Sequence, residues 1–208
     1  MSLKIPIKEI WREKQRTIIL IIVILASLIL LPFDLPIVIF IANLRHPTLN
    51  ILFVYFTNYG NYIFAVIEGI ILVLCSKSKE KQKYSIAIIF SYVGWFVSSR
   101  IVSSLKIITQ RPRPYKIAKN LKLSGTWAGG YSFPSGHSAS AFSLSVPLII
   151  ETKSRIIKIV LIFFAILMAF SRVYCGVHYP TDILWGSYIG YIISSSIYNM
   201  YKSKRHNK

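Results

Sequence analysis

Residues 153–182 read KSRIIKIVLIFFAILMAFSRVYCGVHYPTD, and this stretch determines the class of fold. It begins with basic residues and continues as an apolar run over 156–174. A transmembrane helix needs about 20 predominantly apolar residues. The far end of the run carries four polar or charged residues, Ser171, Arg172, His178 and Asp182. Because ionisable residues beside a membrane segment are functional candidates by default, the stretch predicts a spanning helix that ends in a chemical site.

Five further segments have the character of spanning helices. With the first they give six candidate spans, at 17–32, 51–75, 84–105, 136–151, 156–174 and 180–201. The segment 136–151 has the weakest pattern because it is short, rich in serine and interrupted by Pro147, which tends to kink a helix. Residues 32–50 are broken by three prolines and Asp34, so we expect an outer loop or a short interfacial helix there.

The distribution of basic residues orients the spans. Lysine and arginine cluster at the N-terminus and in the segments 77–83, 153–158 and 202–208. Loops on the cytoplasmic side of a membrane carry an excess of these residues. Six spans place all four clusters on one side, so both termini are expected in the cytoplasm. The loops 33–50, 106–135 and 173–179 then face outward.

The composition agrees with a membrane protein. The chain has 208 residues, 54% of them hydrophobic, which is too apolar for an ordinary soluble domain. A net charge of +18 would indicate nucleic-acid binding in a soluble protein. Here apolar runs separate the charges and no single basic face forms. We therefore expect the lipid bilayer, and no nucleic acid, as a partner.

The outer loop 106–135 is itself basic, against the trend of the other outer loops. Lys106 ends the third span, and Arg113 lies in the stiff run Arg-Pro-Arg-Pro. A guanidinium binds phosphate through two parallel hydrogen bonds, and lysine acts as a point charge. The two cations thus favour an anion site. Attraction to anionic lipid headgroups, or extension of Lys106 from a helix end toward water, would explain them as well.

A second motif, Pro134-Ser135-Gly136-His137, opens the fourth candidate span. Free backbone N–H groups at a helix N-terminus attract anions, and Gly136 lets the backbone come close to a ligand. Ser135 can add a hydrogen bond, and a protonated His137 can donate a proton to a leaving oxygen. The simpler interpretation is a serine that caps the helix next to an incidental histidine.

The third motif contains Arg172, which closes the fifth span, and then His178 and Asp182. Pro180 suits the first turn of the sixth helix, so Asp182 lies in that turn, within reach of the His178 ring. A carboxylate in this position fixes the tautomer and orientation of an attacking imidazole. The alternative is a carboxylate placed favourably near a helix N-terminus.

Together the three motifs resemble the signature of the type 2 phosphatidic acid phosphatase (PAP2) superfamily, which includes bacterial acid phosphatases and vanadium haloperoxidases. All signature positions are matched in order over 106–182: Lys106-x6-Arg113-Pro114, Pro134-Ser135-Gly136-His137 and Ser171-Arg172-x5-His178-x3-Asp182. The six-span pattern extends the resemblance over most of the chain. The resemblance implies a single all-α domain over 1–208, a six-transmembrane-helix bundle with both termini cytoplasmic and the active site at the outer face of the plasma membrane.

The resemblance also implies a role for each matched residue. His178 is expected to be the nucleophile that forms a phosphohistidine, Asp182 to orient it, and His137 to protonate the leaving group and later activate water. The phosphoryl oxygens are expected to be bound by Lys106, Arg113, Ser135, Gly136 and Arg172. No metal and no cofactor is expected, because three cations supply the positive charge.

The implied function is an integral membrane lipid phosphatase whose substrate keeps its chain in the bilayer. A polyprenyl diphosphate of the undecaprenyl or dolichyl type is the preferred substrate, by analogy with small members of the family. Alternatives are phosphatidic acid or phosphatidylglycerophosphate, transfer of the phosphoryl group to another acceptor, and a non-catalytic binding protein. A vanadium haloperoxidase is remote, since those relatives are larger and soluble.

Three charged residues outside the signature have open roles. An intramembrane carboxylate such as Glu68 is a functional candidate, although we favour a hydrogen bond inside the bundle. Arg100 could reach the site or make a structural pair. Arg111 could assist Arg113.

Overall fold

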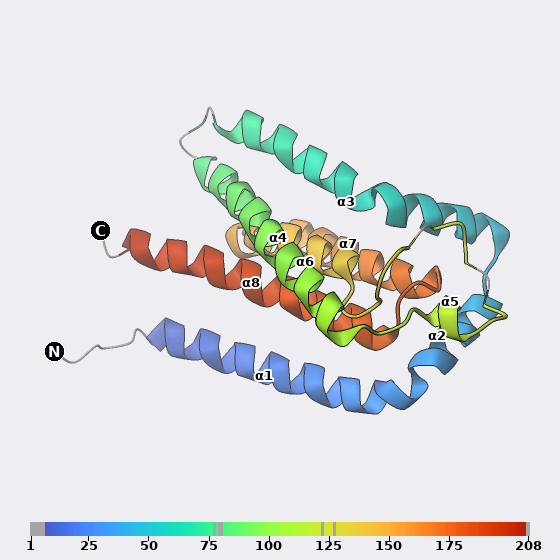
Figure 1. The fold of residues 1–208 in the computed structure, drawn as a ribbon. Coiled ribbons are helices and arrows are strands. Elements are labelled where there is room, and N and C mark those ends of the chain that lie inside the picture. Colours follow the sequence, from blue (N-terminus) through green and yellow to red (C-terminus); the bar gives the residue numbers. More distant parts are fainter. Residues whose placement is uncertain (1–6, 77, 79–80, 122, 127, 207–208) are drawn as a thin grey trace.

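The computed structural model describes residues 7–76, 78, 81–121, 123–126 and 128–206. Parts of the basic N-terminus, of the loop 77–83 and of the basic tail fall outside these ranges. The regular elements of the described residues are helices (Figure 1). They are α1 (Ile7–Leu30), the 3-10 turn η1 (Leu31–Phe33), α2 (Asp34–Asn43), α3 (Pro47–Ser76), α4 (Gln82–Thr109), the short α5 (Pro114–Ile117), α6 (Gly136–Glu151), α7 (Arg155–Tyr174) and α8 (Pro180–His206).

The predicted helices are confirmed. The candidate spans fall on α1, α3, α4, α6, α7 and α8, and α6 has the predicted bounds, with Pro147 inside one continuous helix. Of the two alternatives for residues 32–50, the structure has a short helix, α2.

Four stretches of the described residues are long and apolar enough to cross a membrane: Trp11–Asn43, Pro47–Cys75, Gln82–Ile117 and Arg155–Tyr174. The helix α6 has only 16 residues, and α8 is the least apolar of the long helices. A six-span arrangement thus requires α6 and α8 to cross the membrane inside the bundle, where their polar side chains face protein.

Small and polar residues allow this packing around α6. Gly186 and Gly190 on α8 lie against the backbone of α6, and a Cβ atom on Gly186 would collide with the carbonyl oxygen of Ser135. Small residues of this kind let membrane helices approach closely. The buried Ser143 hydroxyl of α6 lies 2.8 Å from the Ser98 hydroxyl of α4. The close approach at Gly186 places the N-terminus of α6 beside the first turn of α8.

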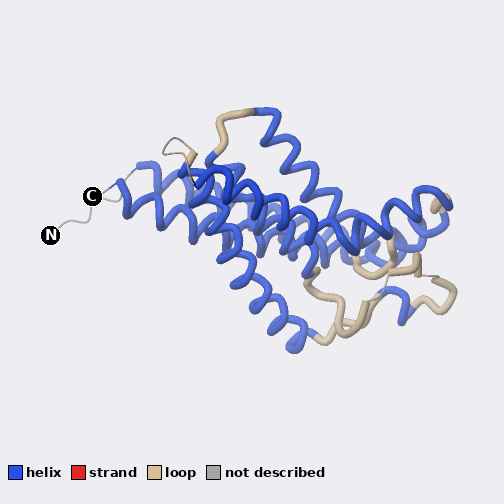
Figure 2. The backbone as a smooth tube through the Cα atoms, turned by 90° about the horizontal axis from the view of Figure 1, so that it is seen from above, coloured by secondary structure: helices blue, strands red, loops and turns tan. Residues whose placement is uncertain are grey.

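The loops that carry the three motifs lie at one end of the bundle. Figure 1 shows both chain termini at the opposite end, with α1 and α3 on the outside. Figure 2 shows the long connection between α4 and α6 gathered at the end away from the termini. This end of the molecule therefore holds the polar residues that the sequence singled out.

Candidate active site

His178 and Asp182 form the centre of the site. His178 lies in the connection between α7 and α8, and Asp182 lies in the first turn of α8. The His178 Nδ1 atom is 3.2 Å from Asp182 Oδ2, which also accepts a hydrogen bond of 3.0 Å from the Tyr179 backbone N–H. Both side chains are buried, with exposures of 2% and 0%. The predicted pairing of these two residues is therefore present.

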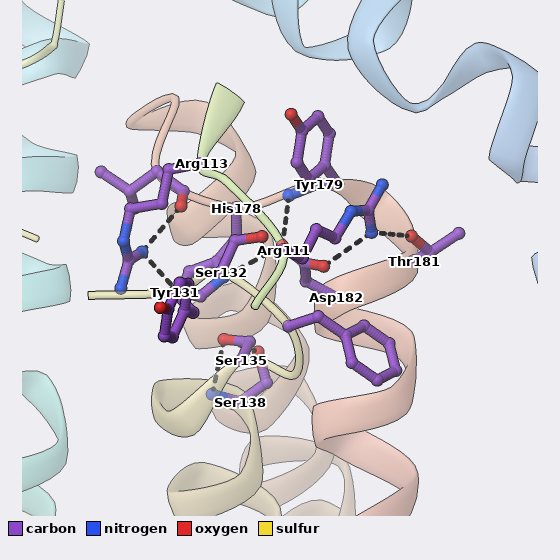
Figure 3. Close-up of polar contacts among 12 residues, drawn as sticks. Arg111, Arg113, Tyr131, Ser132, Ser135, Ser138, His178, Tyr179, Thr181 and Asp182 are labelled. Atoms are coloured by element: carbon purple, nitrogen blue, oxygen red, sulfur yellow. Dashed lines mark hydrogen bonds and ion pairs between the residues drawn. The ribbon is translucent and has the colours of Figure 1, made fainter. Parts of the chain in front are cut away.

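Arg113 contacts the other side of the same imidazole. Its Nη1 atom is 3.2 Å from His178 Nε2 and donates to the Val177 carbonyl over 2.8 Å. Figure 3 shows the His178 side chain between Arg113 and Asp182. A guanidinium only donates and a carboxylate only accepts. The two partners therefore assign the proton to Nδ1 of His178 and leave Nε2 unprotonated, with a lone pair that accepts from Arg113; an imidazole needs an unprotonated nitrogen to act as a nucleophile.

Burial, together with the charges around it, keeps the His178 ring neutral. Burial lowers the pKa of His178 well below its usual 6.5, and the positive charges of Arg113, Arg172 and Lys106 lower that pKa further. The neutral form of the ring is therefore favoured at pH 7.

Carbonyl oxygens and hydroxyl groups hold the cations around this ring. Lys106 Nζ donates to the carbonyls of Tyr131 and Ser132 over 2.8 and 3.1 Å. Arg172 comes from the last turn of α7 and is 2% exposed. Its Nη1 atom donates to Thr57 Oγ1 over 2.5 Å, and the buried Nε atom of Arg172 has no partner within the described residues. The predicted cations thus converge from three different parts of the chain.

The second motif forms the N-terminus of α6. Ser135 is buried and caps the helix, because its Oγ atom accepts from the Ser138 backbone N–H over 3.4 Å, as the simpler interpretation predicted. Its own N–H donates to the Asp182 carbonyl over 2.9 Å, which ties the second motif to the third. His137 lies in the first turn, after Gly136, and Arg172, His178, Arg113 and Lys106 are its electrostatic neighbours.

Arg111 lies between two carboxylates. Its Nη1 atom donates to Asp182 Oδ1 over 2.7 Å, and its Nη2 atom donates to Asp34 Oδ2 over 2.7 Å. Arg111 therefore contacts the Asp182 carboxylate through the oxygen that does not bond the His178 ring (Figure 3). The sequence left the role of Arg111 open, and the structure gives it a contact with Asp182.

Two residues of this network were missed from the sequence, Asp34 and Thr57. From the sequence, Asp34 was interpreted only as a break in an apolar segment. An acidic residue in such a segment could also have indicated a functional role. Thr57 had no signal, because a threonine inside a spanning helix is ordinary. Only the fold places α3 beside the end of α7.

The other charged residues lie apart from this cluster. Glu68 is 1% exposed and accepts from the Ser91 hydroxyl over 3.3 Å, which confirms the hydrogen bond expected inside the bundle. Arg100 is exposed, and its guanidinium lies 5.9 Å from the centre of the Phe96 ring. Across the described ranges, no group of three or more His, Cys, Asp or Glu side chains is placed to hold a metal ion.

This chain is similar to one known protein family and to several known proteins. The family model of the PAP2 superfamily matches residues 82–206. The undecaprenyl-diphosphatase of Sulfolobus acidocaldarius is 30% identical over 148 residues, which are 71% of this chain and 68% of that protein. The crystal structure of Aquifex aeolicus LpxE has a TM-score of 0.66 and 27% identity, over 79% of this chain and 94% of that one. A PAP2-type phosphatidylglycerolphosphate phosphatase from Bacillus subtilis has the same fold, with a TM-score of 0.70 and 20% identity over 90% of this chain and 96% of that one.

Proposed function

The chain belongs to the PAP2 superfamily and is a membrane lipid phosphatase, and we propose that its substrate is a polyprenyl diphosphate. The observation that carries the proposed chemistry is the His178 ring between Arg113 and Asp182, which fixes the lone pair on Nε2. The similarity to an undecaprenyl-diphosphatase over most of both chains favours the polyprenyl substrate. Phosphatidylglycerophosphate is the second candidate, because a phosphatase for that lipid has the same fold.

In the proposed mechanism, His178 Nε2 attacks phosphorus and forms an N–P bond while the bond to the leaving oxygen breaks. His137 gives that oxygen its proton. Asp182 stabilises the positive charge that develops on the His178 ring. His137 then takes a proton from water, which attacks the phosphohistidine and releases phosphate and the free His178 ring. Lys106, Arg113, Arg172 and the α6 N-terminus at Ser135 and Gly136 stabilise the phosphoryl oxygens in both steps.

A cavity of about 150 Å³ beside His137 supports a lipid leaving group. Its lining is mostly apolar and includes Tyr62 and Trp95, which are 72% and 40% exposed on the outside of the bundle. A chain bound there would lie next to the proposed proton donor. The lipid could thus remain in the bilayer while its phosphate enters the site.

The proposed topology has six spans, with both termini in the cytoplasm and the site at the outer face of the plasma membrane. The positions of both termini at one end of the bundle and of the motif loops at the other support it (Figure 1). The whole chain is proposed to act as one domain.

The substrate assignment is tested by phosphate release from detergent-purified protein in EDTA. The substrates are a polyprenyl diphosphate, phosphatidylglycerophosphate, phosphatidic acid and a soluble sugar phosphate. We expect release without metal, fastest from the polyprenyl diphosphate. Faster release from phosphatidylglycerophosphate would assign the second candidate. Release that stops in EDTA and returns only with a divalent cation would contradict the metal-independent mechanism.

Orthovanadate is expected to inhibit the enzyme in competition with substrate. Vanadate adopts the five-coordinate geometry of phosphorus during in-line displacement, and transition-state analogues bind more tightly than substrates. Inhibition is measured as a rise in apparent KM with vanadate concentration. Full activity at millimolar vanadate would contradict the proposed site.

Replacing Thr57 with valine is expected to lower kcat/KM by about 10- to 100-fold, the loss of a hydrogen bond to a charged group. Valine has nearly the shape of threonine but cannot accept from Arg172, whose guanidinium is then free to turn. Thr57→Ser keeps the acceptor and is expected to retain most activity. Equal kinetics for Thr57→Val and wild type would show that Arg172 is held by other groups.

A further inference from the structure

We propose that Asp34 and Arg111 act as positioning residues for Asp182, so that the N-terminal segment α1–α2 contributes to the active site. This inference rests on the proposed function of His178 and Asp182. Asp34 lies outside the region 82–206 that matches the family model, and Arg111 is not one of the signature positions that the sequence matches.

The first support is the division of the Asp182 carboxylate between two sets of donors. Oδ2 accepts from the His178 ring and from the Tyr179 backbone, at 3.2 and 3.0 Å. Oδ1 accepts from Arg111 Nη1 at 2.7 Å. Because each oxygen is held by a different donor, rotation of the carboxylate would break hydrogen bonds on both sides. Arg111 therefore fixes the direction from which Asp182 faces His178.

The second support is the way in which Asp34 holds Arg111. Asp34 is 2% exposed and is the first residue of α2. Its Oδ2 atom accepts from Arg111 Nη2 at 2.7 Å and from the Thr181 hydroxyl, and its Oδ1 atom accepts from the Thr181 backbone N–H at 3.0 Å. The Arg111 guanidinium also lies 3.9 Å from the centre of the Tyr179 ring. Asp34 thus binds both Arg111 and the turn of α8 that carries Asp182.

The third support is the balance of charge. The ionisable groups around His178 come from several elements. They are Lys106 of α4, Arg113 of the following loop, His137 of α6, Arg172 of α7 and Asp182 of α8, and Arg111 and Asp34 lie behind Asp182. The attacking ring becomes positive, and three cations already oppose that charge. An Arg111 without Asp34 would be a fourth. Asp34 neutralises Arg111 and leaves the charge of Asp182 available to the ring.

The test is the kinetics of Asp34→Asn, which keeps the shape of the side chain and removes its charge. We expect kcat to fall by about 10- to 100-fold, the size of the effect known for residues that orient metal ligands through a hydrogen bond. We expect KM to change by less than about twofold, because the phosphate-binding cations are untouched. The matched control is Glu151→Gln. Glu151 is the last residue of α6, at the end away from the site, and its carboxylate forms an ion pair of 2.9 Å with Lys202, which the change breaks. Its kcat should stay at the wild-type value.

Two further readouts separate positioning from a structural role. In Asp34→Asn the added positive field should move the acid limb of kcat/KM, which reports the pKa of His178, to lower pH. Adding Arg111→Gln to Asp34→Asn should lower kcat little further, because both residues act through the same Asp182 carboxylate. A wild-type kcat in Asp34→Asn would overturn the inference. So would a double variant in which kcat falls by the product of the factors measured for Asp34→Asn and Arg111→Gln alone.

Two controls keep the result interpretable. If size-exclusion chromatography shows that the Asp34→Asn protein is not folded, the Arg111→Lys variant is assayed instead. Lysine keeps the charge but cannot bridge two carboxylates with two parallel arms, so kcat should still fall at constant KM. A wild-type kcat in Arg111→Lys would overturn the inference. Wild type and His178→Ala are assayed alongside: an active wild type and an inactive His178→Ala retain the proposed function even where the Asp34 inference fails.

Discussion

Replacing His178 with alanine is expected to lower kcat by on the order of 10⁴- to 10⁶-fold, as loss of a catalytic nucleophile does in other enzymes with covalent intermediates. The Nε2 atom carries the lone pair that attacks phosphorus, and Arg113 and Asp182 hold it in that form. Alanine removes the atom that forms the N–P bond. The measurement is phosphate release from the purified variant under saturating polyprenyl diphosphate.

His46→Ala is the matched control for this variant. His46 is exposed and lies in the connection between α2 and α3, so its replacement should leave kcat unchanged. Both variants are compared with wild type by size-exclusion chromatography, since a buried His178 also contributes packing. A folded His178→Ala protein with near-normal turnover would show that another group attacks phosphorus.

Replacing Asp182 with asparagine is expected to lower kcat by on the order of 10³- to 10⁴-fold, the effect of the same change in serine-protease triads. Both oxygens of Asp182 accept hydrogen bonds, one from Arg111 and the other from His178 and Tyr179. Whichever way the asparagine amide turns, its NH₂ group meets a donor. The ring of His178 then loses the partner that keeps the proton on Nδ1.

The Asp182→Asn variant is assayed for kcat and KM on the same substrate. KM should stay within about threefold of wild type, because the cations that bind the phosphate remain. A kcat within about tenfold of wild type would mean that Asp182 is dispensable for orienting His178, and the assignment of its role would be wrong.

The helical fold could be predicted because its signals are local. Runs of apolar residues determine the six long helices, and the motif at Ser135 gave the start of α6. The number of spans does not follow from hydropathy in the same way. The helices α6 and α8 are short or polar, and their serines and glycines face neighbouring helices, as at Ser143 and Gly186. Hydropathy alone does not measure that kind of burial.

The site could be predicted as far as its residues are recognisable in short motifs. The pairing of His178 with Asp182 follows from their spacing at the start of a helix. The partners of Arg172 and Arg111 could not be predicted in this way. Thr57 and Asp34 are 115 and 77 residues away from them in the chain, and only the packing of α3 and α2 against α7 and α8 brings each pair together.

The covalent intermediate on His178 can be trapped directly. Wild-type protein is mixed with a polyprenyl diphosphate labelled in its terminal phosphate, quenched during the first turnover and digested, and the labelled peptide is identified by mass spectrometry. The proposed mechanism predicts label on His178, lost in acid and retained in alkali as expected for a phosphoramidate, with none on the His178→Ala protein. Turnover by the wild-type enzyme with no labelled protein at any quench time, or label on another residue, would contradict it.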